Sequence, residues 1–134
     1  MGLSPHAEAL VSWYQTRDLT ALADLLHEDV FWGDPAFPDA PRACHSRSEV
    51  LAQYRLLMGT GTGVRATIVD VVQSDTAVAL GLSVEWPPES HRETPDVRYQ
   101  VFTFRGGRIS QIVGADDRRA VVEMLSGARS SETP

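Results

Sequence analysis

The chain has 134 residues, 43% of them hydrophobic and 22% charged, with a formal net charge of −6 and one cysteine. Its length suits a single domain with a buried core, and its composition is that of an ordinary globular protein. The acidic balance argues against a nucleic-acid or acidic-membrane partner, one cysteine excludes an internal disulfide, and no apolar run reaches the length of a membrane span.

The N-terminal residues predict two helices. Ser4 followed by Pro5 is typical of an N-cap and a first helical position, and the apolar residues after them keep helical spacing to about Arg17. Asp18 is placed to cap a second, short helix that reaches Leu26.

A short strand and a third helix come next. Residues 30–32 predict a brief strand, and a proline-rich loop that begins at Asp34 follows it. The segment SRSE, from Ser46 to Glu49, is a capping box, in which each outer side chain accepts a hydrogen bond from the backbone of the other residue. The apolar residues after it keep helical spacing, and Gly59 ends the predicted helix.

The second half of the chain predicts a sheet. After the GTGTG segment the hydrophobic period changes from helical to alternating, which is typical of strands. Turns at 74–75 and 106–107 and one polar, proline-flanked loop separate the predicted strands. These strands cover residues 64–72, 78–86, 97–105 and 108–115.

This order of elements predicts an α+β fold. Three N-terminal helices would pack on a curved, mostly antiparallel sheet, followed by a short C-terminal helix that starts at Asp116 or Asp117 and runs through Leu125. We expect one domain over residues 1–126 and a disordered tail over residues 127–134. A strongly bent sheet closed by a long helix forms a cone, whose interior is a natural small-molecule pocket.

Three stretches resemble a known group of proteins: RDLTALADLLHEDVFWGDP, HSRSEVLAQYRLL and YQVFTFRGGRISQI. They are similar to the ketosteroid isomerases and SnoaL-like polyketide cyclases of the nuclear transport factor 2-like superfamily, over roughly residues 7–125. The resemblance implies a cystatin-like α+β cone. It also places Asp34, the aspartate before a proline, at the position of the proton-shuttling base of ketosteroid isomerase.

The same resemblance leaves both known catalytic sets incomplete. In the ketosteroid isomerase pattern, Gln100 stands at the position of the protonated aspartate and Leu10 at that of the tyrosine, with Tyr14 one turn further along the same helix face. In limonene epoxide hydrolase, a relative in the same superfamily, Arg98 and Asp116 match the arginine and the second carboxylate. Gln100 there replaces the first carboxylate.

Strand alternation predicts which side chains line the interior of the cone. Arg98, Gln100, Phe102 and Phe104 share one face of their strand. The residues expected to contact a ligand are Tyr14, Trp32, Val78, Leu80, Leu82, Val84, Phe102 and Ile112. The polar groups expected to converge among them are Asp34, Arg98, Gln100, Asp116 and, as a further donor, Tyr14. An apolar cavity with a few polar groups is the usual form of a ligand site.

This polar set has the chemistry of a general base with supporting donors. Burial would raise the pKa of Asp34, whereas Arg98 nearby would lower it, and an intermediate pKa suits a general base. The amide of Gln100 could donate a hydrogen bond to a developing enolate or alkoxide.

Each of these residues also has a structural interpretation. Asp34 is a common turn residue before proline. Arg98 and Asp116 fit a structural ion pair, and Asp116 also fits the N-cap of the last helix. Gln100 would face solvent if the strand register shifted by one residue. Trp32 also suits the core or a dimer interface.

Two functions stay open on the sequence alone. The first is a small enzyme without a cofactor that carries out acid–base chemistry on a hydrophobic carbonyl, polyketide-like or epoxide substrate. Asp34 would be its base, and Arg98, Gln100 and Asp116 would orient substrate or water and stabilise negative charge. The second is a non-catalytic ligand-binding or dimerisation module of the same fold, in which phenylalanine side chains fill the cone.

The expected partners follow from the same residues. The four histidines are not at metal-ligand spacing, so we expect neither a metal nor a cofactor. We expect a hydrophobic small molecule as ligand, and a homodimer because the outer face of such a sheet often carries exposed apolar residues, here Tyr99 and Val101. The first ten residues lack the basic and apolar segments of a secretion signal, which predicts a cytoplasmic location.

Overall fold

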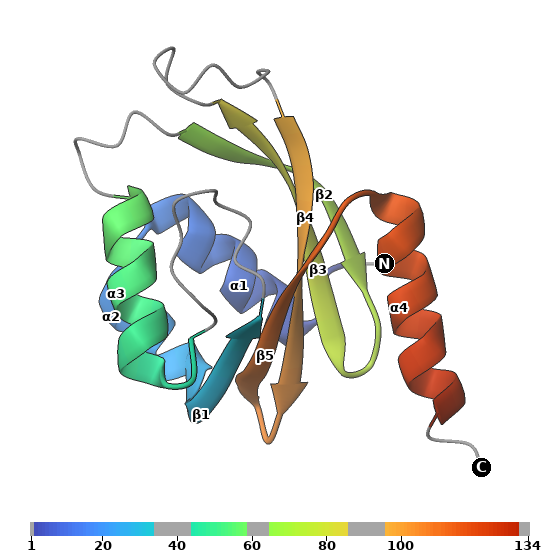
Figure 1. The fold of residues 1–134 in the computed structure, drawn as a ribbon, viewed down its shortest axis with the longest axis horizontal. Coiled ribbons are helices and arrows are strands. Elements are labelled where there is room, and N and C mark those ends of the chain that lie inside the picture. Colours follow the sequence, from blue (N-terminus) through green and yellow to red (C-terminus); the bar gives the residue numbers. More distant parts are fainter. Residues whose placement is uncertain (1, 34–43, 59–64, 86–95, 132–134) are drawn as a thin grey trace.

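Helices and sheet form three layers in the structure, a computed structural model that describes residues 2–33, 44–58, 65–85 and 96–131. Helices α1, α2 and α3 lie on one side of the sheet and α4 lies on the other (Figure 1). In chain order the elements are α1 (Pro5–Thr16), α2 (Leu19–Leu25), β1 (Leu26–Gly33), α3 (Arg47–Met58), β2 (Arg65–Gln73), β3 (Ala77–Glu85), β4 (Asp96–Arg105), β5 (Arg108–Ala115) and α4 (Arg118–Ser131).

The strands form one mixed, five-stranded sheet in the order β1-β5-β4-β3-β2. Strand β1 runs parallel to β5, and the other neighbours are antiparallel. The predicted α+β class and the curved, mostly antiparallel sheet are confirmed (Figure 1). The parallel pair joins β1 and β5, which are far apart in the chain, whereas β2 to β5 follow one another in the chain as antiparallel neighbours.

The predicted caps of the first two helices are confirmed. The Ser4 hydroxyl accepts a hydrogen bond from the backbone N–H of Ala7 at 3.2 Å. The Asp18 carboxylate accepts one from the backbone N–H of Thr20 at 2.9 Å. Because the first N–H groups of a helix have no partner within the helix, these side chains set where α1 and α2 begin.

The capping box of α3 is confirmed in one half and differs in the other. The Ser46 hydroxyl accepts from the backbone N–H of Glu49 at 3.2 Å, as predicted. The Glu49 carboxylate instead accepts from the backbone N–H of His45 at 2.7 Å, one residue before the expected donor. The Glu49 carboxylate therefore fixes His45, the residue that leads into the helix, and the Ser46 hydroxyl fixes the helix start.

The boundaries that differ most from the prediction are the start of β1, predicted at residue 30, and the end of α4. Leu26 has extended backbone and pairs with Ile109 of β5, so β1 begins there and the second helix ends one residue earlier than expected. Helix α4 continues to Ser131, past the predicted end at Leu125, so residues 127–131 have helical backbone. A domain boundary at residue 126 stays a prediction.

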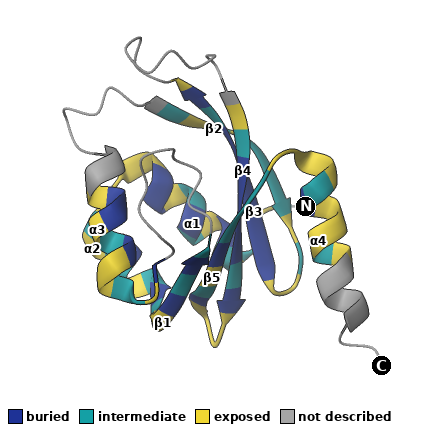
Figure 2. Ribbon diagram, in the orientation of Figure 1, coloured by how far each residue is buried: buried dark blue, intermediate teal, exposed yellow. Residues whose placement is uncertain are grey.

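The central strands are buried on both faces (Figure 2). The face toward α1, α2 and α3 carries large apolar side chains. The opposite face carries Ala77, Ala79, Tyr99 and Val101, which pack with Val121 of α4. Tyr99 and Val101 are only 8% and 3% exposed, so the expectation that they lie open on the outer face is wrong. It failed because α4 covers them.

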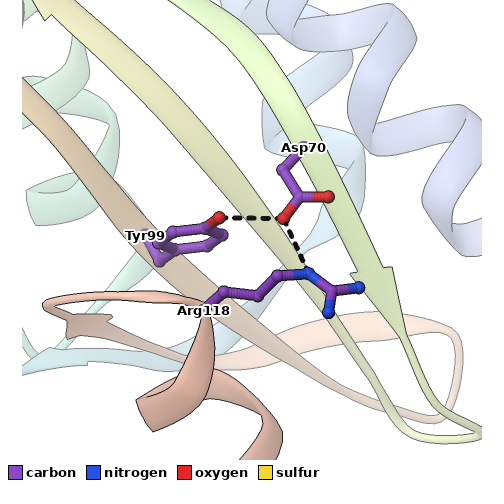
Figure 3. A network of polar contacts seen from close by, with 3 residues as sticks. All are labelled: Asp70, Tyr99 and Arg118. Atoms are coloured by element: carbon purple, nitrogen blue, oxygen red, sulfur yellow. Dashed lines mark hydrogen bonds and ion pairs between the residues drawn. The ribbon is translucent and has the colours of Figure 1, made fainter.

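A polar cluster ties α4 to this face, and we call its members, Asp70, Tyr99 and Arg118, the α4 clamp (Figure 3). The Tyr99 hydroxyl donates to the Asp70 carboxylate at 2.8 Å, and Arg118 Nε donates to the same oxygen at 3.0 Å. Burial, followed by the hydrogen bond to Asp70, raises the pKa of Tyr99. The clamp joins β2, β4 and the first turn of α4.

The clamp requires glycine at position 81. A Cβ atom there would lie 2.7 Å from the ring of Tyr99 and 2.9 Å from the Cβ of Asp70. The tyrosine ring therefore crosses β3 where that strand has no side chain, and this lets its hydroxyl reach Asp70 on β2.

We predict that Gly81→Ala destabilises the fold by about 1–3 kcal/mol, the usual effect of overpacking a core. The added methyl group would push the Tyr99 ring away from Asp70 and loosen α4. Urea unfolding measures the change, with Gly2→Ala as the control because a Cβ at Gly2 meets nothing within 4 Å. Equal unfolding midpoints for both variants would contradict the close approach.

Candidate functional site

Four aromatic side chains meet between the helices and the sheet. The ring of Tyr54, from α3, stacks on Trp32 of β1 with a centroid distance of 4.7 Å and an interplanar angle of 22°. The edge of Trp13, from α1, meets Tyr54 at 5.1 Å and Tyr14 at 5.3 Å. All four are less than 9% exposed. We call these four residues the aromatic cluster.

Trp32 is held in this cluster by the backbone on both of its sides. Within the sheet it lies opposite Ile112 of β5. On its other side the N–H of Trp32 donates to the carbonyl of Cys44 at 2.9 Å, and the N–H of Cys44 donates back at 3.0 Å. The indole thus sits on a strand that is paired on two sides, which fixes the surface on which Tyr54 stacks.

One polar group of the sheet points into this region. Gln100 of β4 is 3% exposed, and its side-chain oxygen accepts a hydrogen bond from the Tyr54 hydroxyl at 3.2 Å. The predicted inward direction of Gln100 is confirmed, and the alternative in which it faces solvent is wrong. Both partners are neutral, so the pair places hydrogen-bonding groups in the interior without burying a charge.

The interior tyrosines stay protonated at neutral pH. Burial raises the pKa of Tyr14 to about 12, although Arg17 lowers it somewhat. Burial, followed by the nearby Tyr14 and Cys44, raises the pKa of Tyr54 well above its ordinary value of 10.0. Because both hydroxyls keep their protons, they can donate hydrogen bonds to an oxygen, but they cannot serve as the base of a reaction.

The predicted apolar lining lies around this pair. Leu80 pairs with Gln100, and Val78 and Ile112 lie on either side of Phe102 in the sheet register. Every residue of the predicted lining belongs to the same buried core cluster: Tyr14, Trp32, Val78, Leu80, Leu82, Val84, Phe102 and Ile112. The structure therefore brings the expected lining together on the face that α1, α2 and α3 cover.

The predicted charged residues that the structure describes do not gather in the interior as the apolar lining does. Asp34 lies outside the described residues. Arg98 is half-buried and lies two residues from Gln100 along β4, on the same face. Asp116 is exposed and follows the end of β5. Asp117, not Asp116, caps α4, because its carboxylate accepts from the N–H of Ala120 at 2.8 Å.

Sequence reasoning missed two members of the aromatic cluster. It treated Tyr54 only as part of the apolar face of a helix, and it assigned no role to Trp13. A signal for Tyr54 was present, because a glutamine placed inward by strand alternation needs a buried hydrogen-bond partner. The α4 clamp was missed as well, since its three members are far apart in the sequence.

The described residues contain neither a group of potential metal ligands nor a helix that could span a membrane. Within the described ranges, no three side chains of histidine, cysteine, aspartate or glutamate are grouped so that they could hold a metal ion. Among the helices that the structure describes, none is both long and apolar enough to cross a membrane.

Solved structures of other proteins share this fold. A candidate polyketide cyclase from Sinorhizobium meliloti gives a TM-score of 0.65 at 15% identity, over 84% of this chain and 95% of that one. TerC, co-crystallised with polyporic acid, gives 0.63 at 19% identity, over 92% and 99%. An LEH-like epoxide hydrolase from M. tuberculosis gives 0.59 at 17% identity, over 91% and 93%. At these identities the likeness shows the fold alone.

The family of the chain is shown by a match to a family model, because the solved structures show only the fold. No curated protein matches the chain significantly. The model of the SnoaL-like domain matches residues 7–112, which run from the first turn of α1 into β5. Because this match spans most of the chain, and because the helices and sheet form the cystatin-like α+β fold, the chain belongs to the SnoaL-like domain family of the nuclear transport factor 2-like superfamily.

Proposed function

We propose that the chain is a small, cofactor-independent enzyme that carries out acid–base chemistry on a hydrophobic small molecule bound between the sheet and helices α1, α2 and α3. The observation that supports this most strongly is the neutral Tyr54–Gln100 pair, buried among aromatic and aliphatic side chains. Such donors stabilise negative charge on a substrate oxygen more effectively in an apolar surrounding than in water.

The proposed roles divide between neutral donors and charged groups. Gln100 would donate from its amide nitrogen to the oxygen on which an enolate or alkoxide develops, Tyr54 would hold that amide in place, and Tyr14 would be a further donor. Asp34 would be the general base, since a carboxylate can take the proton that a neutral tyrosine cannot. Arg98, on the same strand face as Gln100, would orient the substrate, and the exposed Asp116 would act at the mouth of the site.

The relatives support the chemical class by analogy. Cyclases, isomerases and epoxide hydrolases all occur among solved structures of this fold, and TerC was crystallised with a small organic acid. The homodimer, the hydrophobic ligand and the cytoplasmic location belong to the same proposal.

One observation favours a second function, a non-catalytic ligand-binding or dimerisation module. Phe102 is fully buried and Phe104 is 7% exposed, so both side chains occupy part of the interior. In this alternative the Tyr54–Gln100 pair would specify the packing of α3 on the sheet rather than bind a substrate oxygen. Ligand binding by the interior and its dependence on Asp34 separate the two functions.

Tyr54→Phe tests whether the buried pair binds a ligand oxygen. We expect the variant to bind a bicyclic phenol such as 2-naphthol about ten-fold more weakly, because Tyr54 no longer holds the Gln100 amide in place and the hydrogen bond from that amide to the phenol oxygen is lost. Leaving Gln100 without its partner should also cost about 1–3 kcal/mol of stability. Tryptophan fluorescence measures binding, and urea unfolding measures stability.

The matched control is Tyr99→Phe, which removes a buried hydroxyl from the opposite face of the sheet. It should reduce stability and leave phenol affinity unchanged. If both variants bind the phenol as tightly as the wild-type chain, the interior near Tyr54 is not the ligand site.

Asp34→Asn tests the proposed base. A carboxylate close to the ligand repels the phenolate form of the phenol by about 1 kcal/mol at ~4 Å in a water-like surrounding, or about five-fold in Kd. We therefore expect the substitution to tighten phenol binding, and to do so more as rising pH ionises the phenol. Asp75→Asn, at the exposed turn between β2 and β3, is the control and should change nothing. Identical binding by both variants at every pH would make Asp34 a turn residue and favour the binding module.

All three tyrosines of the chain have raised pKa values, which predicts an alkaline unfolding transition. Since the folded state favours the protonated phenol groups, their stabilisation is fully present below pH ~10 and is lost at higher pH, for Tyr14 as pH rises toward about 12. The sequence contains no lysine, so tyrosine dominates titration in this window. Absorbance at 295 nm should show less tyrosinate at pH 10 in the folded chain than in the unfolded chain.

The same titration in concentrated urea is the control and should give the ordinary tyrosine pKa of about 10. A folded chain in which Tyr14 or Tyr54 ionises at that ordinary value, as Tyr14→Phe and Tyr54→Phe would reveal, would contradict the buried, neutral hydroxyls on which the proposed site depends.

A further inference from the structure

The turn between β4 and β5 brings two arginines opposite each other. Gly106 and Gly107 form this two-residue turn with φ values of 61° and 82°, the left-handed backbone that tight hairpins require. Arg105 and Arg108 flank the turn and are directly paired in the register of the two strands. Like charges at such a cross-strand position destabilise the pair. The sequence RGGR therefore builds a repulsion into the tip of the hairpin.

A histidine from β1 lies beside these arginines. Nη2 of Arg105 is 3.3 Å from Nε2 of His27. The start of β1 and the β4–β5 turn are at the same end of the sheet (Figure 1). Because β5 runs between β1 and β4, the Arg105 side chain reaches His27 across the start of β5, where Arg108 lies. We call His27, Arg105 and Arg108 the hairpin cluster.

Two hydrogen-bond donors face each other in the hairpin cluster. The backbone N–H of Asp29 donates to Nδ1 of His27 at 3.1 Å, so Nδ1 is the acceptor nitrogen of the ring. A neutral imidazole has one acceptor nitrogen, and its other nitrogen carries the proton. Nε2–H therefore points toward the guanidinium of Arg105, which can only donate. An acceptor oxygen at this place would satisfy both groups.

Among the described residues, no carboxylate supplies that oxygen. Glu28 and Asp29, which follow His27 in β1, are exposed, and neither forms an ion pair with an arginine of the hairpin cluster. Arg118 and Arg119 on α4, by contrast, each have a carboxylate partner. The hairpin cluster is thus a concentration of donors and positive charge on a chain whose net charge is −6.

We propose that the hairpin cluster binds a phosphate group, either as inorganic phosphate or as the phosphate of a small ester. Nε2 of His27 and Nη2 of Arg105 are close enough for one oxygen to accept from both, and the guanidinium of Arg108 can bind a second oxygen. A phosphate group also carries more than one negative charge near neutral pH, which offsets the repulsion between the two arginines. The cluster lies at the end of β4 away from Arg98, so this site is separate from that of the proposed function.

The first experiment is an NMR titration of the intact ¹⁵N-labelled chain with inorganic phosphate. Gly106 and Gly107 each give a backbone amide signal beside the hairpin cluster, and we expect both signals to shift with saturation in the millimolar range. Sodium chloride at the same ionic strength should shift them less and without saturation, because it screens charge and does not bridge the donors. Glycerol 3-phosphate is titrated in parallel, and the tighter of the two phosphates identifies the form that the site prefers.

The second experiment compares three variants that each lose one positive charge. Arg105→Gln and Arg108→Gln should each bind phosphate about ten-fold more weakly, because a charge-assisted hydrogen bond is lost. Arg119→Gln is the matched control, since it removes an exposed arginine from α4, and it should leave phosphate binding nearly unchanged. All three positions are exposed, so the variants should fold as the wild-type chain does.

The third experiment supplies the acceptor from within the chain. Arg108→Glu replaces the like-charge pair by an opposite-charge pair, so it should raise the unfolding temperature at low ionic strength and abolish phosphate binding. The inference is wrong if phosphate shifts the two glycine signals no more than chloride does. It is also wrong if Arg119→Gln weakens phosphate binding as much as Arg108→Gln, because the effect would then come from net charge alone.

Discussion

The structure depends on one constraint, which is that the central strands β3 and β4 are buried on both faces. Because successive side chains of a strand point to opposite faces, each residue belongs to one of two cores according to its place in the alternation. The row toward α1, α2 and α3 is bulky, with Leu80 and Phe102. The row toward α4 includes Ala79 and Gly81, whose small size lets the helix and the ring of Tyr99 approach the sheet closely.

The same alternation decides where polar groups can be tolerated. Gln100 falls in the row that faces α1, α2 and α3, so its amide needs a partner from a helix, and Tyr54 supplies one. Tyr99 falls in the other row and finds Asp70 on β2. Leaving either group unpaired would cost more than its hydrogen bond contributes. Gln100 thus ties α3 to the sheet, and Tyr99 ties α4 to it through Asp70 and Arg118.

Local patterns explain what could be predicted from the sequence, and distant contacts explain what could not. The caps at Ser4 and Asp18 depend on the next few residues, and the inward direction of Gln100 depends on alternation alone. The end of α2 was misplaced because Leu26 pairs with a strand more than eighty residues later in the chain. The role of Tyr54 was hidden because helical spacing reports only that a face is buried, whatever hydroxyl it carries.

The chemistry of the described interior is that of neutral donors. Tyr14 and Tyr54 hold their protons far above neutral pH, so neither can remove a proton from a ligand, and Tyr54 uses its proton to hold the Gln100 amide. An acid–base enzyme built on this interior therefore needs its carboxylate at the edge, where water keeps the charged form accessible. Asp34, the base of the proposed function, follows Trp32 by two residues in the sequence. In that proposal the donors and the base are separate groups, so that one can ionise while the others stay neutral.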